Sequence, residues 1–344
     1  FPLSERITLD NERCILCSRC VRFTREVSHS NGLGIESRGD HSLIRPSGDG
    51  AFGRDAYSDN VIDLCPVGAL LSNSFQYKAR VWYLKPTPSV CPGCERGCGV
   101  QIWHRRAEWK LNRLDAKANA AIDRVTPLES AAVNGPWICN KGRDLARVFE
   151  RARAERPLLK GRPATAAEAI ENARRLIAAA RRPVALVSSW GSDEELAAFK
   201  AALGTRFTAL VKADHRPEPG EVLADALLIR PDKNPNGTAA RALFGTAPAV
   251  VPADADLVLV WGEGADFGAI PATAKIVLLD AWLAPENGHA DVFLPLSIQT
   301  ERAGHYTNFE GVVSAFEPCF EPPAQALDAA RLFAALAGQA EAAA

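Results

Sequence analysis

The chain contains the triplet Cys14-Ile-Leu-Cys17-Ser-Arg-Cys20, and a single Cys65, followed by proline, comes much later. Three thiolates at this spacing can bind three corners of a cubane iron–sulfur cluster, and a distant cysteine must supply the fourth ligand. In bacterial ferredoxins the cysteine before a proline binds a different cluster from its own triplet, which makes Cys65 the expected closing ligand. We therefore predict a [4Fe–4S] cluster on Cys14, Cys17, Cys20 and Cys65.

Structural zinc is the alternative interpretation of this group. Zinc sites usually combine two Cys-x2-Cys pairs, or cysteine with histidine, and this triplet does not divide into two pairs. Nearby positive charge would raise the reduction potential of an anionic cluster. Four arginines lie beside the ligands and fit that role, although they also fit a solvated helix face: Arg13, Arg19, Arg22 and Arg25.

A second cysteine group reads Cys91-Pro-Gly-Cys94-Glu-Arg-Gly-Cys98, and Cys139 follows after a long gap. This triplet spacing predicts a second [4Fe–4S] cluster on Cys91, Cys94, Cys98 and Cys139. The glycines between the ligands permit a close approach of backbone N–H groups to the cluster. Lys141 and Arg143 follow Cys139 and fit a role in offsetting cluster charge, although Lys141 also fits an ordinary surface lysine.

Length and composition limit the class of protein. The chain has 344 residues and a formal net charge of -1, which suits two or three domains and gives no indication of nucleic-acid binding. No apolar run is long enough to cross a bilayer. The chain has nine cysteines, eight of them in the two groups, which indicates metal ligands and not a disulfide scaffold. Because residue 1 is Phe and the chain has no Met, we expect the numbering to begin inside a longer product.

The sequence predicts α+β iron–sulfur domains followed by an α/β domain with a mainly parallel sheet. The predicted domains are a first cluster domain over 1–80, a second over 81–155 and the α/β domain over 156–344. In the first two we expect a helix over 21–27 and strands over 7–10, 78–84, 99–104 and 107–111, with Pro86 and Pro88 ending the strand over 78–84. The α/β domain has helical patterns at 166–181 and from Ser192, and apolar strand patterns at 182–188, 207–211, 257–261, 275–279 and 292–294.

Several weaker patterns carry no assigned function. The turn Gly262-Glu-Gly264-Ala-Asp-Phe-Gly268 resembles a dinucleotide loop, but its spacing and the following Pro271 favour a plain strand-to-loop turn. Cys319 is predicted to be a buried free thiol. His104 is predicted to be a hydrogen-bonded structural residue. No catalytic residue is assigned.

Several segments together resemble one family. They are Glu12 to Val27, Arg38-Gly-Asp-His-Ser42, Asp63-Leu-Cys65-Pro-Val-Gly-Ala-Leu70, Lys78-Ala-Arg-Val-Trp82, Ser89 to Cys94 and Trp137-Ile-Cys139. They resemble the large iron–sulfur subunit of proton-pumping NADH:quinone oxidoreductase, the respiratory complex I of bacteria. Relative to that family, the chain looks amino-terminally truncated, without the [2Fe–2S] domain and the His-plus-three-Cys segment.

The resemblance implies an electron-transfer subunit of an oxidoreductase complex with no substrate-converting site of its own. The first cluster would lie on the main electron path from NADH and flavin toward quinone, and the second would be the additional cluster that only some members keep. The implied partners are other peripheral-arm subunits, namely the NADH/flavin subunit and neighbouring iron–sulfur subunits, with no nucleic acid and no membrane insertion. The implied location is peripheral, on the cytoplasmic side of the bacterial inner membrane.

The later region is similar to the molybdopterin-oxidoreductase fold, in Ala290-Asp-Val-Phe-Leu-Pro295 and Thr307-Asn-Phe-Glu-Gly311. In complex I this fold is a scaffold without molybdenum, and the resemblance implies the same for this shortened region. The alternative function is a molybdopterin-dependent oxidoreductase of the formate dehydrogenase type, in which the second cluster would feed a pterin-bound metal.

Overall fold

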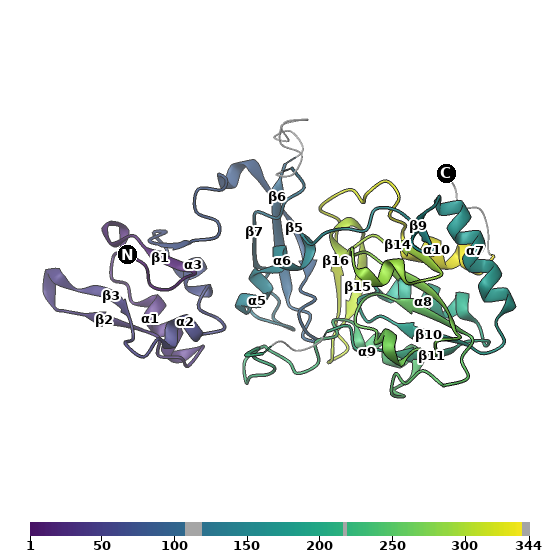
Figure 1. Ribbon diagram of the computed structural model, residues 1–344. Coiled ribbons are helices and arrows are strands. Elements are labelled where there is room, and N and C mark those ends of the chain that lie inside the picture. The colour runs from purple at the N-terminus through teal and green to yellow at the C-terminus, as the bar shows by residue number, and fades with distance from the viewer. Residues whose placement is uncertain (107–118, 216–218, 339–344) are drawn as a thin grey trace. The chain divides into compact units, whose positions relative to one another are not determined.

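The computed structural model describes residues 1–106, 119–215 and 219–338. The chain divides into two compact units (Figure 1). The first consists of Phe1–Thr87, Cys98–Val148 and Ala224–Ile229. The second consists of Pro88–Gly97, Phe149–Leu223 and Arg230–Ala344. Each unit is described by itself below, and the division into three domains at residues 80 and 155 stays a prediction.

The first unit begins with small elements around the first cysteine group. The predicted strand and helix near the triplet are confirmed as β1 (Ile7–Leu9) and α1 (Arg19–Glu26). β1 pairs antiparallel with β4 (Leu70–Ser72), with Leu9 opposite Leu70. Because β1 precedes the triplet and β4 follows Cys65, this pairing returns Cys65 to the triplet. The connection between them contains β2 (Leu33–Glu36), β3 (Leu43–Pro46), α2 (Ala51–Arg54) and α3 (Asn60–Leu64).

A three-stranded sheet carries the next part of the chain, in the order β5 (Leu84–Val90), β6 (Gly99–Arg105) and β7 (Arg124–Pro127). The strand predicted over 78–84 is wrong, because a 3-10 helix occupies Val81–Tyr83 and β5 starts at Leu84. Pro86 and Pro88 lie inside β5, which tolerates them because it is an edge strand. The strand predicted over 99–104 is confirmed as β6, whereas 107–111 lies outside the described residues.

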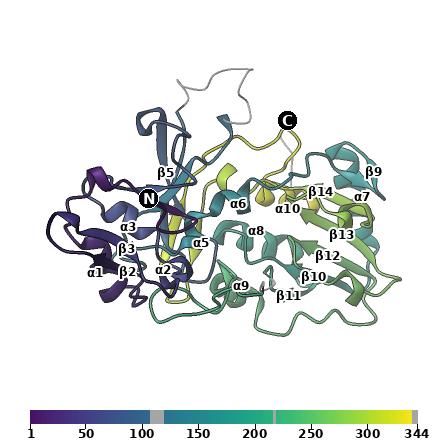
Figure 2. The same cartoon turned by 60° about the vertical axis from the view of Figure 1, so that its left-hand side comes forward.

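The second unit is built on a seven-stranded sheet (Figure 2). Its order is β11 (Thr208–Val211), β10 (Pro183–Val187), β12 (Leu257–Trp261), β13 (Lys275–Asp280), β14 (Val292–Pro295), β8 (Leu158–Leu159) and β9 (Arg162–Pro163). The first five strands are parallel, and β8 and β9 continue the sheet antiparallel. All five strands predicted in this region, and its mainly parallel sheet, are therefore confirmed.

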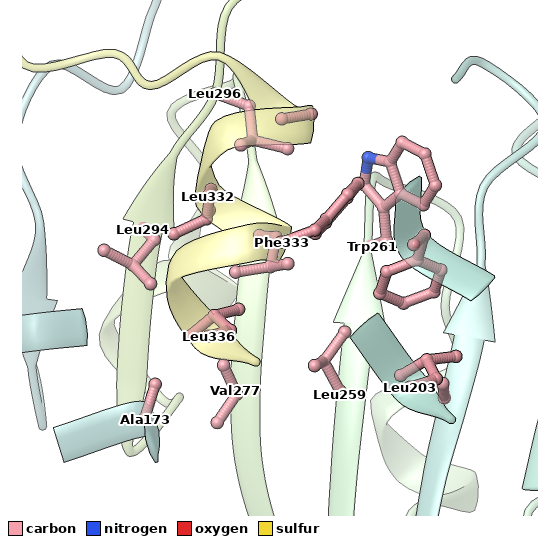
Figure 3. Close-up of a cluster of buried hydrophobic side chains, with 14 of the residues drawn as sticks. Ala173, Leu203, Leu259, Trp261, Val277, Leu294, Leu296, Leu332, Phe333 and Leu336 are labelled. Carbon is pink, nitrogen blue, oxygen red and sulfur yellow. The ribbon is translucent and has the colours of Figure 1, made fainter. Parts of the chain in front are cut away.

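Helices cover this sheet and bury its apolar residues. The two predicted helices are confirmed as α7 (Ala166–Ala179) and α8 (Asp193–Leu203), and the capping box of Ser192 and Glu195 is formed. Two further helices are α9 (Gly237–Phe244) and α10 (Ala329–Leu336). Trp261 and Phe333 meet in one buried cluster (Figure 3), with ring centroids 4.8 Å apart. Burying each such side chain stabilises the fold by about 1.5–3 kcal/mol.

Sequence patterns did not predict the hairpin of β15 (Gly304–Thr307) and β16 (Val313–Phe316). The glycine turn after β12 has left-handed backbone at Gly262 and Gly264, with φ of +72° and +89°. A Cβ on Gly264 would lie 2.7 Å from the Ala213 carbonyl oxygen, so the turn packs directly on the neighbouring loop. Cys319 is buried, as predicted.

Candidate iron–sulfur sites

The four cysteines of the first group line one pocket of the first unit: Cys14, Cys17, Cys20 and Cys65. Its remaining wall is mostly apolar and comes from one end of the β1 and β4 pairing, where Leu9 lies opposite Leu70, and from Ile44 in β3. The structure thus brings together all four residues that the sequence predicts as ligands of the first cluster. Thiols beside an apolar wall fit an iron–sulfur group, because such a wall limits the access of solvent and lowers the local dielectric.

The ligand loop reaches this pocket through an unusual backbone. Leu16 and Ser18 both have left-handed backbone, with φ of 54° and 59°. For residues with a Cβ this conformation costs roughly 1–2 kcal/mol each. α1 then begins at Arg19 and holds Cys20 in its first turn. The two left-handed residues curl the loop between the cysteines, and the sequence gives no signal for them because neither is glycine.

Cys65 enters from the other side of the pocket. It follows α3 directly and has extended backbone. The backbone N–H of Ala69 donates a hydrogen bond to the Cys65 sulfur at 3.2 Å, across a turn in which Gly68 has a φ of +63°. A donor of this kind stabilises negative charge on the thiolate.

Burial disfavours the thiolate form of one cysteine in this pocket. It raises the pKa of the Cys20 thiol to about 11, and the neighbouring Cys14 and Cys17 contribute to that rise. A metal bound to Cys20 would offset this cost, because a coordinating thiol is deprotonated.

The four arginines of this region are exposed at the surface. Three of them form ion pairs: Arg13 with Asp10 at 3.1 Å, and Arg22 and Arg25 with Glu26 at 3.2 Å and 3.7 Å. Pairing and solvent both weaken the field of these three arginines at the pocket. Their proposed influence on the reduction potential stays a prediction.

Within the described residues, no three His, Cys, Asp or Glu side chains converge on a point where one metal ion could be held. The assignment of the first cysteine group to a cluster therefore rests on its spacing and on the pocket that its four members line.

The second cysteine group is divided between the two units. In the second unit Cys91 is buried, and the Gly93 N–H donates to its sulfur at 3.4 Å. The loop is anchored at both ends: Gln299 donates to the Val90 carbonyl oxygen at 2.7 Å, and the Glu95 N–H donates to the carbonyl oxygen of Asp232 at 2.9 Å. The Gly93 N–H thus reaches the sulfur of Cys91, and its approach to a bound cluster stays a prediction.

Cys98 and Cys139 belong to the first unit, where a buried Asn134 links their neighbourhoods. Its side-chain oxygen accepts from the Gly99 N–H at 2.9 Å, and its amide group donates to the Trp137 carbonyl oxygen at 3.0 Å. A Cβ on Gly99 would lie 2.8 Å from the Leu128 carbonyl oxygen.

His104 is buried, with its Nε2 atom 2.8 Å from the Thr87 hydroxyl, which confirms the predicted structural role. Sequence reasoning missed Tyr57, whose hydroxyl donates to Asp225 at 2.5 Å. Burial, then Asp225 and more weakly Cys139, raise the pKa of Tyr57. The segment Ala224–Ile229 thus joins the first unit from a distant part of the sequence, for which no local pattern exists.

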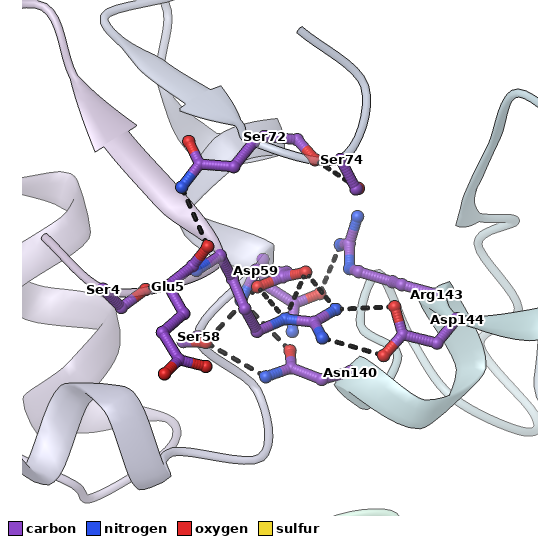
Figure 4. A network of polar contacts seen from close by, with 12 residues as sticks. Ser4, Glu5, Ser58, Asp59, Ser72, Ser74, Asn140, Arg143 and Asp144 are labelled. Carbon is purple, nitrogen blue, oxygen red and sulfur yellow. Dashed lines mark hydrogen bonds and ion pairs between the residues drawn. The ribbon is translucent and has the colours of Figure 1, made fainter. Parts of the chain in front are cut away.

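A polar network lies between α3 and α5 (Asn140–Arg143), the short helix that follows Cys139 (Figure 4). Arg6 donates to Asp59 at 2.7 Å and to Asp144 at 2.8 Å, with 27% of its side chain exposed. The Arg143 guanidinium, predicted only to offset cluster charge, donates to Asp63 and Asn60. Lys141 is exposed.

The second unit has a separate pocket at the carboxyl ends of β10, β12 and β13, where parallel sheets often bind ligands. Its walls include the indoles of Trp190 and Trp282 and the carboxyl groups of Asp214 and Asp280. Burial, and next the charge of Glu263, raise the pKa of Asp280 to about 7. Among the described residues, none that lines this pocket is a cysteine or histidine.

Two family models match the chain. Residues 4–71 match "NADH-quinone oxidoreductase subunit 3, ferredoxin-like domain", and residues 84–150 match "Molybdopterin oxidoreductase Fe4S4 domain". Each match contains one complete cysteine group. The second model indicates by its description that such domains carry iron–sulfur clusters.

Curated relatives agree with these matches. NADH-quinone oxidoreductase subunit 3 of Thermus thermophilus is 36% identical over 46% of this chain and 18% of its own length. An NADH-quinone oxidoreductase subunit of Streptomyces coelicolor is 34% identical over 52% of this chain and 20% of its own. NADPH-Fe(3+) oxidoreductase subunit alpha of Geobacter sulfurreducens is 31% identical over 48% of this chain and 17% of its own.

The chain spans about a fifth of the length of these relatives. The comparisons confirm the resemblance that the sequence motifs predict. Residues 4–71 are therefore similar to the ferredoxin-like domain of NADH-quinone oxidoreductase subunit 3, residues 84–150 are similar to the molybdopterin-oxidoreductase Fe4S4 domain, and the chain is similar to subunits of NADH-quinone oxidoreductases.

Proposed function

We propose that this chain relays electrons within an NADH:quinone oxidoreductase, through two [4Fe–4S] clusters and without molybdenum. The observation that carries the proposal is the pocket lined by Cys14, Cys17, Cys20 and Cys65, which lies inside the ferredoxin-like match. Cys91, Cys94, Cys98 and Cys139 are proposed to hold the second cluster. The relatives named as NADH-quinone oxidoreductase subunits support this role.

A bound cluster supplies one-electron transfer, so the residues of the chain need no acid, base or nucleophile. Their task is to hold the sulfur ligands rigidly and to set the potential through burial, charge and hydrogen bonds. At the first site the apolar wall of Leu9, Ile44 and Leu70 limits water, and the Ala69 N–H donates to the Cys65 sulfur. Rigid ligands keep the reorganisation on electron transfer small.

The proposed partners are the NADH/flavin subunit and the neighbouring iron–sulfur subunits of the peripheral arm. The proposed location is peripheral, on the cytoplasmic side of the bacterial inner membrane. Among the described residues, no helix is both long and apolar enough to span a bilayer. The Geobacter relative favours a second candidate, an electron-transfer subunit of an NADPH-dependent iron(III) oxidoreductase.

Low-temperature EPR of the dithionite-reduced protein tests the cluster assignment. We expect about eight irons per chain and no molybdenum, with two cubane signals. Cys65→Ala should remove one signal and Cys139→Ala the other, whereas Cys319→Ala is the matched control and should remove neither. Two signals that survive both substitutions would show the ligand assignment to be wrong. Stoichiometric molybdenum with formate-dependent dye reduction would instead support the molybdopterin enzyme.

Reconstitution with partner subunits separates the two electron-transfer candidates. NADH-dependent reduction of a quinone that is lost in Cys65→Ala would support the complex I role. NADPH-dependent reduction of iron(III) with no quinone reduction would support the second candidate.

A further inference from the structure

In the first unit, one cation links the helix that leads to Cys65 with the helix that follows Cys139. Arg143 closes α5, which begins directly after Cys139, and its side chain is only 8% exposed. Its Nη2 atom donates to the Asp63 carboxylate at 2.5 Å and to the Asn60 side-chain oxygen at 2.9 Å. Both acceptors belong to α3, which ends one residue before Cys65. The Arg143 guanidinium therefore contacts α3, which leads into Cys65 of the first group. Arg143 itself belongs to α5, which follows Cys139 of the second group.

The surrounding contacts make this link stiff. Asn60 is 1% exposed and also donates to the Ile138 carbonyl oxygen at 2.8 Å, next to Cys139. Asn140 accepts from the Asp59 N–H at 3.1 Å and donates to Ser58 at 3.0 Å. Hydrogen bonds between residues in or next to α3 and α5 therefore accompany the ion pair, and Figure 4 shows those of Asn140. The Arg143 side chain is buried whereas 35% of the Asp63 side chain is exposed, so the loss of Asp63 leaves a buried cation without its charged partner between the two helices.

We propose that Arg143 is a positioning residue that couples the two cysteine groups, so that the reduction potentials of both clusters depend on this one side chain. The inference rests on the proposed function. A cation stabilises the reduced, more negative form of a nearby cluster and so raises its potential. Asp63 opposes this effect. Arg124 is the second cation near Asp63, and its own pKa is lowered by burial and by Arg143, while Asp63 raises it.

The test is a potentiometric EPR titration of the purified protein, with each signal assigned by its loss in Cys65→Ala or Cys139→Ala. Arg143→Gln should lower both midpoint potentials, changing the ratio of reduced to oxidised cluster at least about threefold, or about 28 mV at 59 mV per tenfold. Asp63→Asn should raise both. Arg143→Lys keeps the charge and should stay near the unchanged protein.

Arg147→Gln is the matched control, because Arg147 is an exposed arginine of α6 (Leu145–Phe149), one turn further along. It should shift neither potential. A shift confined to one signal in Arg143→Gln, or an equal shift in Arg147→Gln, would overturn the coupling.

Thermal unfolding of the same samples gives a readout that does not depend on iron. Arg143→Gln and Asp63→Asn should each lower the unfolding temperature, and the double variant should lose less than the sum of the two. Strict additivity of the two effects would overturn the link between α3 and α5. If the protein binds no iron but the two effects are not additive, the proposed function fails while the structural link stands.

Discussion

Asn60 and Ile138 hold each other through both sides of one amide: the Asn60 side chain donates to the Ile138 carbonyl oxygen at 2.8 Å and accepts from the Ile138 N–H at 3.3 Å. Both residues are 1% exposed. The Asn60 amide thus pairs with both the backbone N–H and the backbone carbonyl oxygen of Ile138, as a neighbouring strand would do in a sheet. The segment leading to Cys139 is therefore fixed to α3 without any sheet pairing at that point.

Asn60→Ala is expected to lower the free energy of unfolding by about 2–4 kcal/mol, because it leaves two buried backbone groups without their partner. Asn73→Ala is the control, since the exposed Asn73 donates to the Glu5 carbonyl oxygen where water can replace it. The control should lose less than about 1 kcal/mol. Urea unfolding of both variants gives the comparison, and equal losses would contradict the importance of burial here.

Arg6→Met is expected to destabilise the protein by about 2 kcal/mol, because Asp59 and Asp144 then face each other without their shared cation. We place the loss below that of a fully buried pair because 27% of the Arg6 side chain is exposed. Arg13→Met removes an exposed pair with Asp10 and should change stability by less than about 0.5 kcal/mol. Similar unfolding midpoints for the two variants would contradict a stabilising role for the ion pairs of Arg6 with Asp59 and Asp144.

Gly99→Ala is expected to reduce the content of the second cluster while sparing the first. The added Cβ would lie 2.8 Å from a backbone oxygen, so the strand that follows Cys98 must move. Gly34→Ala is the control, because a Cβ there meets nothing within 4 Å. Iron analysis should show about four irons in Gly99→Ala against about eight in the control. Loss of both clusters would indicate general misfolding instead.

Asp280 predicts a dependence of stability on pH. Its pKa is about 7 in the folded protein against an ordinary value near 3.9 in the unfolded chain, so the folded state binds the proton more tightly. Stability from this group is greatest below pH of about 4 and is lost as the pH rises through about 7. Asp280→Asn should therefore raise the unfolding temperature at pH 8 and raise it less at pH 5. An equal effect at both pH values would contradict the raised pKa.

The parallel sheet was predictable because its strands are continuous apolar runs separated by helices, as in Leu257–Trp261 and Lys275–Asp280. The two cysteine groups were equally visible from their spacing, and their assignment as cluster ligands stays a proposal. β5 was misplaced because prolines usually mark breaks, and only the sheet order reveals that an edge strand holds Pro86 and Pro88. Local patterns describe a residue's neighbours in sequence, and β5 depends on its neighbours in space.

The same limit explains what was missed around the sites. The left-handed residues Leu16 and Ser18 have side chains that usually avoid that conformation, so only the finished loop shows them. Arg6 forms hydrogen bonds with Asp144, and Tyr57 with Asp225, although the partners of each pair lie far apart in the sequence. Such pairs have no sequence period and form only when distant elements pack.

Of the eight proposed ligands, Cys17 is the one classed as exposed, whereas Cys91 and Cys98 are buried. Dioxygen and chelators dissolved in the surrounding water therefore reach the Cys17 corner of the first site without any opening of the fold. When the isolated chain is handled in air, oxidative damage should begin at Cys17. The visible absorbance of the proposed first cluster should therefore decrease before that of the second.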